Sequence, residues 1–319
     1  MARFVMEFER PLVELEEKLA ELKRLDIAAT PDLADEIAGL ETEIEKLRET
    51  LYSALSPWEK VQVSRHPGRP KTQDYVETLF EDVVELHGDR SFGDDEAIMT
   101  ALATLDGRRC MVIGHRKGKN TKENIKRNFG SPHPEGFRKA RRAMKLAEKF
   151  GLPIVTLIDT QGAFPGLEAE QRGQAWAIAE NLATLAALRT PIVVVGIGEG
   201  GSGGALAIGF GDHLIMLENA YYSVITPEAC ASIIFKDATR APEAAPCLAM
   251  TADDLLRLGI ADEIVPEPRG GAHREPATVF ASVARVVSEA LRQLTEMPLD
   301  ELVEERYRRL GAIGVYNEQ

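Results

Sequence analysis

A glycine-rich stretch two-thirds along the chain carries the residue types that could do chemistry. Residues 191–211 read PIVVVGIGEGGSGGALAIGFG, in which five apolar residues lead into glycines and then into a small apolar run. This order predicts a strand, a tight loop and a helix. Three chemistries use that arrangement, and the letters satisfy the pattern of each: a dinucleotide site, a nucleophilic serine and an oxyanion hole.

A dinucleotide site is indicated by Gly196, Gly198 and Gly201, which match G-x-G-x-x-G. Glu218 lies 20 residues after Gly198, where a ribose-binding acid would sit. Two features disfavour this interpretation. The helix predicted after the glycines is short and is interrupted by Gly209, and a long βα segment precedes the match. A lone match to this pattern is weak support for a nucleotide site.

A nucleophilic serine is indicated by Gly200, Ser202 and Gly204, which match G-x-S-x-G. Such a serine needs a histidine base and an acid that orients it, and in these hydrolases both follow the serine in sequence. The histidines after it are His213, at the end of the next predicted helix, and His273, in a loop. A serine in this place is also an ordinary helix cap, so the pattern does not establish catalysis.

An oxyanion hole needs less than either alternative. Gly203 and Gly204, directly before Ala205, would offer backbone N–H groups to a point where negative charge develops. Glycines allow a close approach, and no titrating side chain is required. A donor of this kind typically lowers a barrier by about 3 kcal/mol. The loop at residues 162–166, after the preceding predicted strand, would supply the facing wall.

An internal repeat indicates how these loops are positioned. Residues 153–155 and 191–193 both read Pro-Ile-Val, lie 38 residues apart, and each follow a predicted helix and a short turn. Each predicted strand runs into a glycine-containing loop, at 159–166 and at 198–204. Repeated strand, loop and helix units favour parallel strands joined by crossover helices, which place their ligands at the loops after the strands.

The chain before residue 60 has the pattern of two antiparallel helices. Leucine and isoleucine recur every three or four residues over 8–55, except for a break at 26–31 where Thr30 is a good helix cap. We expect a helical hairpin with a coiled-coil seam, followed by an irregular linker at 66–70. The same patterns predict helices at 72–87, 134–150, 167–188, 202–210, 227–235 and 274–294, and strands at 97–105, 110–114, 153–158, 191–197, 214–217 and 222–225.

The composition is that of an ordinary globular protein: 319 residues, 44% hydrophobic and 28% charged. The chain has no run of eighteen apolar residues and no secretory signal, so no membrane association is expected. Cys110, Cys230 and Cys247 lie far apart without a C-x-x-C pair, which argues against a disulfide framework or a zinc site. We therefore expect a reducing, cytoplasmic location and no metal bound to this chain.

The charge is acidic overall but unevenly distributed. A net charge of −13 argues against a general nucleic-acid binder, so no nucleic-acid partner is expected. Residues 115–142 nevertheless hold ten Lys or Arg against two Glu, a local charge of +8. This stretch is either a solvated helix face or a site for an anionic ligand or an acidic partner, and the sequence leaves both open.

Six motifs spread over nearly the whole chain resemble one enzyme family. They are GHRKG, RNFGSPHPEGFRKA, IDTQGAFPG, GEGGSGGALAIG, YYSVITPEACASI and EPRGGAHR. They are similar to the carboxyltransferase α-subunit family of bacterial-type acetyl-CoA carboxylases. The resemblance implies an α/β, crotonase-like fold of stacked ββα units in a superhelix. It also implies an N-terminal helical hairpin at 1–60, a carboxyltransferase domain at 61–300 and a C-terminal tail at 301–319.

The resemblance further implies a reaction and its partners. In this family the α subunit is active only with a zinc-containing β subunit, in an α2β2 heterotetramer with active sites between the two chains. A carboxyl group passes from carboxybiotin, held on the biotin carboxyl carrier protein, to acetyl-CoA. The product is malonyl-CoA, the first committed building block of fatty acids. Biotin carboxylase belongs to the larger complex, and the biotin ring itself would act as the base.

Site roles carry over from the family by motif. The family's glycine pair matches Gly203 and Gly204, with Ala205 beside them, as the oxyanion hole for the biotin ureido oxygen. The surrounding pocket for biotin and substrate would comprise Gly162, Ala163, Phe164, Pro165, Gly166, Gly201 and Ser202. Contacts with the CoA phosphates, or with an acidic surface of the β subunit, are expected from Lys117, Lys119, Lys122, Lys126 and Arg127.

Two departures and two alternatives accompany the resemblance. The loop after Asp159 usually reads Thr-Pro-Gly-Ala-Tyr-Pro-Gly, whereas Gln161 replaces the proline here and Phe164 the tyrosine, so that a hydroxyl is lost. One alternative is a self-contained acyl-CoA hydratase or decarboxylase of the same fold, which would need Glu199 or Glu168 as its carboxylate. The other is a non-catalytic subunit that docks a partner through the helical hairpin.

Overall fold

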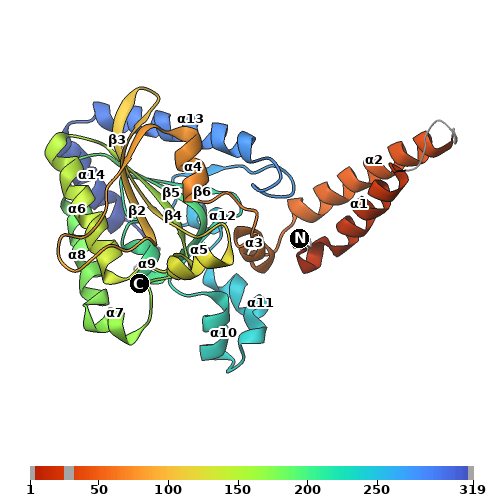
Figure 1. Cartoon of the computed structure of the whole chain (residues 1–319), viewed down its shortest axis with the longest axis horizontal. Coiled ribbons are helices and arrows are strands. Elements are labelled where there is room, and N and C mark those ends of the chain that lie inside the picture. The colour runs from red at the N-terminus through yellow and green to blue at the C-terminus, as the bar shows by residue number, and fades with distance from the viewer. Residues whose placement is uncertain (1–3, 25–31, 315–319) are drawn as a thin grey trace, which may run out of the picture.

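The structure, a computed structural model, describes residues 4–24 and 32–314. Within them the chain forms one 8-stranded mixed sheet (Figure 1). The strand order is β1-β2-β3-β4-β5-β6-β8, and β7 pairs with the end of β5. The strands are β1 (Glu81–Glu85), β2 (Ile98–Leu105), β3 (Arg108–His115), β4 (Ile154–Thr160), β5 (Ile192–Gly201), β6 (His213–Leu217), β7 (Tyr221–Ser223) and β8 (Glu263–Val265).

The sheet is antiparallel at one edge and parallel in its centre. β1, β2 and β3 pair antiparallel, and the Asp106-Gly107 turn joins β2 to β3 as the sequence predicts. From β3 onward the strands are parallel, with Ile154 of β4 opposite Ile192 of β5. The two Pro-Ile-Val repeats therefore lie side by side, and the loops after them leave the same edge of the sheet.

Helices cover the sheet on more than one side. α6 packs on β2 and β3 and against α8, whereas α13 packs on β5, β8 and α4 (Figure 1). Their apolar faces bury one continuous core with the fully buried strands β4 and β5. In the described ranges no helix has both the length and the apolar character to cross a membrane.

The helices begin and end as follows. They are α1 (Arg10–Leu22), α2 (Asp32–Ser53), α3 (Pro57–Ser64), α4 (Thr72–Leu79), α5 (Thr121–Lys126), α6 (Pro134–Phe150), α7 (Leu167–Gln171), α8 (Gln174–Ala187), α9 (Ser202–Leu206), α10 (Pro227–Ile234), α11 (Ala241–Ala244), α12 (Ala252–Arg257), α13 (Pro276–Glu296) and α14 (Leu299–Gly311).

The N-terminal helices α1 and α2 form a hairpin that projects from the body (Figure 1). Leu12, Leu40 and Ile44 are buried in its seam, as the leucine and isoleucine spacing predicts. The predicted break at 26–31 and its Thr30 cap lie outside the described residues. The hairpin is tied to the body by an ion pair of 2.8 Å between Arg269 Nε and Glu49 Oε2.

Some predicted helices are shorter than their patterns suggest. The helix predicted at 72–87 was wrong in its second half, because it ends at Leu79 and β1 follows. Spacing alone cannot separate these states, and pairing of β1 with β2 decides in favour of the strand. The helix predicted at 167–188 is divided at Gly173, whose φ is +82°. The helix predicted at 202–210 ends at Leu206.

The stretch near the C-terminus is helical. Residues 299–311 form α14, and Arg306 on it is buried. Its guanidinium donates to both carboxylate oxygens of Asp212, at 2.7 and 2.8 Å, and to the carbonyls of Leu185, Leu188 and Thr190 at 2.7–3.0 Å. Every N–H group of the Arg306 guanidinium therefore has an acceptor, and α14 is part of the folded body.

Candidate active site

The two glycine loops after β4 and β5 touch each other through their backbones. A Cβ placed on Gly204 would lie 2.5 Å from the carbonyl carbon of Gly162, and it would also meet the amide nitrogen of Ala163. A Cβ on Gly201 would lie 3.0 Å from the Cα of Gln161 and closer still to its carbonyl group. Only glycine fits where backbones approach so closely. The structure thus brings together the predicted loop at 162–166 and the predicted glycine pair.

The first backbone N–H groups of α9 have no partner within the helix itself. Gly201 is the N-cap, so the N–H groups of Ser202, Gly203 and Gly204 have no carbonyl one helical turn before them within the helix. Ala205, which the sequence analysis placed beside the pair, would in a regular helix be the first residue whose N–H can reach a carbonyl one turn earlier. Gly203 and Gly204 are therefore the better candidates for donors.

A partly buried ionic cluster at the ends of β4 and β5 was missed by sequence reasoning. Lys117 Nζ lies 2.7 Å from Asp159 Oδ1 and 2.6 Å from Glu199 Oε2. Arg65 Nε lies 2.6 Å from Glu199 Oε1, which also accepts from the Tyr221 hydroxyl at 2.9 Å. Because Asp159 lies near the end of β4 and Glu199 near the end of β5, the cluster holds the two strand ends together.

The cluster fixes the ionisation of Glu199. Burial by itself favours the neutral acid, but Lys117 and Arg65 lower the pKa of Glu199 to about 2. The same contacts raise the pKa of Lys117 above its ordinary value against the effect of burial. A carboxylate held ionised by two cations is a poor general acid and a weak base. This counts against Glu199 as the catalytic carboxylate of a self-contained hydratase.

A cavity of about 680 Å³ opens beside the cluster. Its basic side chains include Arg65, Lys71 and Lys119, and Gln161 of the first glycine loop reaches its wall. It lies at the carboxyl ends of β4 and β5, where parallel sheets bind their ligands. This position agrees with the repeat in the sequence.

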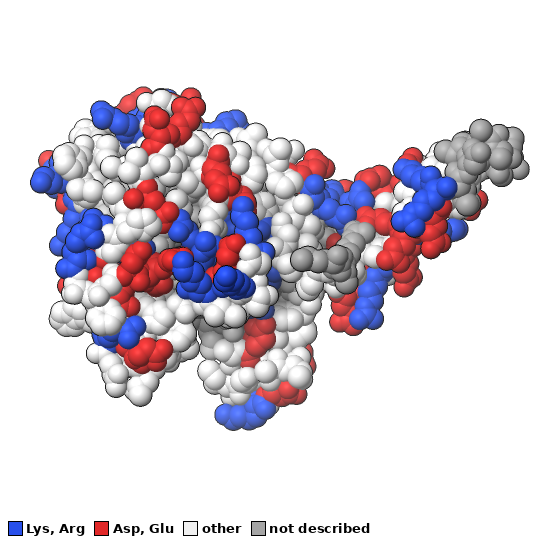
Figure 2. Space-filling view, in the orientation of Figure 1, with Lys and Arg blue, Asp and Glu red and all other residues white. Residues whose placement is uncertain are grey.

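The five basic residues predicted to contact CoA or a partner do not form one free patch. Lys117 is half-buried and is held in the ionic cluster. Lys119 pairs with Asp74 at 2.7 Å, Lys126 with Glu96 at 2.5 Å and Arg127 with Glu123 at 3.0 Å, while Lys122 is exposed. Figure 2 shows the same mixture, with basic and acidic side chains adjacent over α5. The local excess of positive charge is thus partly neutralised within the chain.

Phe164 and Gln161, the two residues of the first loop that differ from the usual family pattern, both contact neighbouring side chains. The ring of Phe164 stacks on His133, with centroids 4.3 Å apart, and the Phe164 N–H donates to the Pro132 carbonyl at 2.9 Å. Gln161 Nε2 donates to Ser131 Oγ at 3.2 Å. Farther along this loop Pro165 is exposed, and Gly166 is the N-cap of α7.

The geometry disfavours a nucleophilic serine. Ser202 is exposed and has a left-handed φ of +54°. Neither candidate histidine serves it: His213 lies 3.8 Å from Glu263, and His273 stacks on His66 with centroids 3.7 Å apart. Within the described part of the chain no hydrogen bond joins Ser202 to a histidine, so the serine lacks the base that a nucleophile needs.

The structure disfavours a dinucleotide site, because the acid expected to bind the ribose already has a backbone partner. The carboxylate of Glu218 accepts the backbone N–H of Glu267 at 2.8 Å, which commits it to the junction after β6 and β8. The glycines of the pattern lie within β5 or pack on the facing loop. Of the three chemistries that the sequence allowed, the geometry therefore supports only the oxyanion hole.

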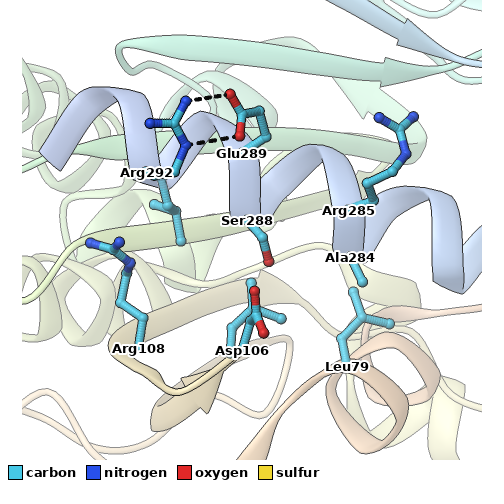
Figure 3. A pocket seen from close by; sticks show the side chains of 10 residues that line it. Leu79, Asp106, Arg108, Ala284, Arg285, Ser288, Glu289 and Arg292 are labelled. Carbon is cyan, nitrogen blue, oxygen red and sulfur yellow. Dashed lines mark hydrogen bonds and ion pairs between the residues drawn. The ribbon is translucent and has the colours of Figure 1, made fainter. Parts of the chain in front are cut away.

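A second hollow, of about 710 Å³, lies at the opposite end of the sheet. It separates α13 from the turn before Arg108, the first residue of β3 (Figure 3). Glu289 and Arg292 pair with each other there, and Arg285 points away from the turn. Its charged groups do not converge, so it has no arrangement that would orient a reacting group.

Comparisons with known proteins identify the family of the chain. A family model described as acetyl co-enzyme A carboxylase carboxyltransferase-like matches residues 5–314. The chain is 50% identical over 313 residues to the acetyl-coenzyme A carboxylase carboxyl transferase subunit alpha of Thermus thermophilus, covering 98% of this chain and 99% of the relative. It is 53% identical to the subunit of that name from a Geobacillus species, covering 98% and 96%.

The fold is also that of solved carboxyltransferases. The transcarboxylase 12S structure superposes with a TM-score of 0.59 at 18% identity, over 72% of this chain. This chain spans 42% of that one, so less than half of its length. The crotonase-like fold predicted from the six motifs is confirmed by this likeness. On its sequence over residues 5–314, the chain belongs to the acetyl-CoA carboxylase carboxyltransferase α-subunit family.

Proposed function

We propose that this chain forms one half of a carboxyltransferase active site, in which the N–H groups of Gly203 and Gly204 stabilise developing negative charge. Family membership carries the reaction: carboxyl transfer from carboxybiotin to acetyl-CoA, giving malonyl-CoA. The close contact between Gly204 and the Gly162–Ala163 peptide supports the choice of this site, because it places the first N–H groups of α9 against the facing loop.

Biotin fits this arrangement through its ureido oxygen. Carboxybiotin, carried on a separate protein, supplies the carboxyl group when it is bound. Gly203 and Gly204 donate to the oxygen on which charge accumulates, and donors fixed before the reaction lose no free energy to reorganisation. The ionic cluster holds the ends of β4 and β5, from which the two glycine loops leave, together. No side chain of this chain needs to exchange a proton, which agrees with the fixed ionisation of Glu199.

The exposed apolar residues around the glycine turn support a shared site. Leu167 of α7 is 72% exposed, Trp176 of α8 is 71% exposed and Leu206 of α9 is 41% exposed. The three helices pack against one another, α7 on α8 and α8 on α9. Large apolar side chains gathered beside a site mark an interface. We assign this face to the β subunit, which would bring zinc, the second oxyanion hole and most acyl-CoA contacts in an α2β2 assembly.

The proposal is tested by decarboxylation of malonyl-CoA in the presence of a free biotin derivative. The assay is run on this chain alone and on this chain co-expressed with a zinc-containing β subunit. Activity in the mixture alone, and dependent on biotin, supports the shared site. Biotin-independent activity of the isolated chain would instead identify a self-contained hydratase or decarboxylase.

A further inference from the structure

One buried histidine connects the two loops of the proposed site. His115 is the last residue of β3, and its side chain is fully buried. Its ring nitrogen Nε2 lies 3.1 Å from the carbonyl oxygen of Gly204, and its Nδ1 lies 3.4 Å from the backbone nitrogen of Asp159. The ring thus spans from the glycine turn to the end of β4, where the facing loop begins.

The Gly204 carbonyl, at 3.1 Å from Nε2, sets the tautomer of the ring, which the Leu157 carbonyl also contacts. A carbonyl oxygen can only accept, so Nε2 carries the proton and donates it to Gly204. The Asp159 N–H can only donate, so Nδ1 is unprotonated and accepts. Burial, together with the nearby Lys117 charge, lowers the pKa of His115 to about 3. The ring is therefore neutral in any ordinary assay buffer, in the tautomer that the geometry requires.

His115 supplies the hydrogen bond that the short helix withholds from Gly204. In a continuing α-helix the Gly204 carbonyl would accept from the N–H of Ile208. Here the Ile208 N–H turns to the carbonyl of Ala205, at 3.3 Å, because α9 ends at Leu206. The preceding carbonyl, that of Gly203, keeps its helical partner, the Ala207 N–H, at 3.0 Å.

The direction of the Gly204 N–H depends on these anchors. Glycine has wider φ and ψ freedom than any other residue, so hydrogen bonds and packing set its orientation. The Ala207 N–H holds the peptide on one side of Gly204, and His115 holds the peptide on the other side. We propose that His115 is a positioning residue of the carboxyltransferase site: it touches no substrate, and by holding the Gly204 carbonyl it limits rotation about Gly204, which keeps the glycine turn and its N–H groups directed at the developing charge. This inference rests on the proposed function.

The experiment compares three variants of His115 in the complex with the β subunit. In His115→Gln the side-chain amide can occupy the place of Nε2 and donate to Gly204. In His115→Asn the shorter side chain can accept from Asp159 but does not reach Gly204, and His115→Leu removes both bonds while filling the space. The rate constant kcat and the KM for malonyl-CoA are measured in biotin-dependent decarboxylation, with Tm and subunit co-purification measured on the same samples.

We expect kcat to fall about 10- to 100-fold in His115→Asn and His115→Leu, somewhat less than the loss of a whole oxyanion donor. KM should stay unchanged, and His115→Gln should recover most of kcat. Equal activity of the Gln and Asn variants would overturn the role, as would a loss of kcat that only follows Tm. If His115→Leu does not fold, the Gln and Asn pair decides.

A spectroscopic measurement tests the tautomer independently of activity. The chain has 6 histidines, so the ¹⁵N signals of His115 in labelled protein can be assigned by comparison with His115→Gln. A proton on Nε2 that persists throughout the neutral pH range is expected, and a ring that titrates there would overturn the inference. A wild-type complex without biotin-dependent activity would refute the proposed function, whereas a fully active His115→Leu complex would refute only the role of His115.

Discussion

A single methyl group on Gly204 should separate the two loops of the active site. In Gly204→Ala the new Cβ would lie 2.5 Å from the carbonyl carbon of Gly162 and 2.9 Å from its Cα. Ordinary contacts between carbon atoms are about 3.5 Å or longer, so the loops must separate by about 1 Å. Both neighbours are backbone atoms and cannot turn aside as a flexible side chain would.

The expected cost falls on catalysis more than on folding. A displacement of about 1 Å within an active site costs on the order of 100-fold in rate. Overpacking of this kind destabilises a fold by about 1–3 kcal/mol, which a domain of this size can tolerate. Gly204→Ala should therefore lose about 100-fold in kcat while it still folds and assembles with the β subunit.

The adjacent glycine provides a matched control. A Cβ on Gly203 would lie 3.6 and 3.7 Å from two carbon atoms of Ile178, which is ordinary contact. Gly203→Ala places the same methyl on the next residue of the same helix, so it should change stability by less than about 0.5 kcal/mol and keep most of kcat. Biotin-dependent decarboxylation, thermal unfolding and co-purification are measured for both variants. Equal activity of the two alanine variants would refute the reasoning from loop contact.

Three further predictions follow from the site and its surroundings. Ser202→Ala should keep most of its activity, because the exposed hydroxyl has no histidine base; a loss of several orders of magnitude in kcat would restore the nucleophile. Because the pKa of Glu199 falls from the ordinary 4.5 to about 2, its ionised contacts stabilise the fold fully above about pH 5, and that stability is lost as the pH falls toward 2. The Tm difference between wild type and Glu199→Gln should therefore be constant at neutral pH and shrink in acid, and a difference that grows in acid would contradict this. Trp176→Asp should weaken association with the β subunit without lowering the Tm of the isolated chain. Tyr307→Asp, at a side chain that is 77% exposed on α14, should leave association unchanged; binding that falls in both variants or in neither would contradict the assignment of the face.

Much of the site could be predicted because its chemistry is carried by backbone. Three catalytic patterns overlap at residues 196–204, and sequence alone could only weigh them against one another. What remained unpredictable was which side chains support the glycine loops. GHRKG contributed to the family resemblance, but nothing in its letters shows that His115 reaches Gly204 or that Lys117 reaches Glu199. Those contacts join residues more than 80 positions apart, and no local pattern encodes them.

The sequence by itself determined the helical hairpin, the parallel repeat with its two loops, and the family. Period and turn chemistry are local, and the six motifs are long enough to be specific. Only the tertiary structure decided that β1 is a strand, because its apolar residues suit a helix equally until β2 offers a ladder of hydrogen bonds. Only the tertiary structure likewise showed that most basic side chains of residues 115–142 form ion pairs with carboxylates of the same chain. The physical reason is the same in both cases: the conformation and the charge contacts of a segment depend on partners that are distant in sequence.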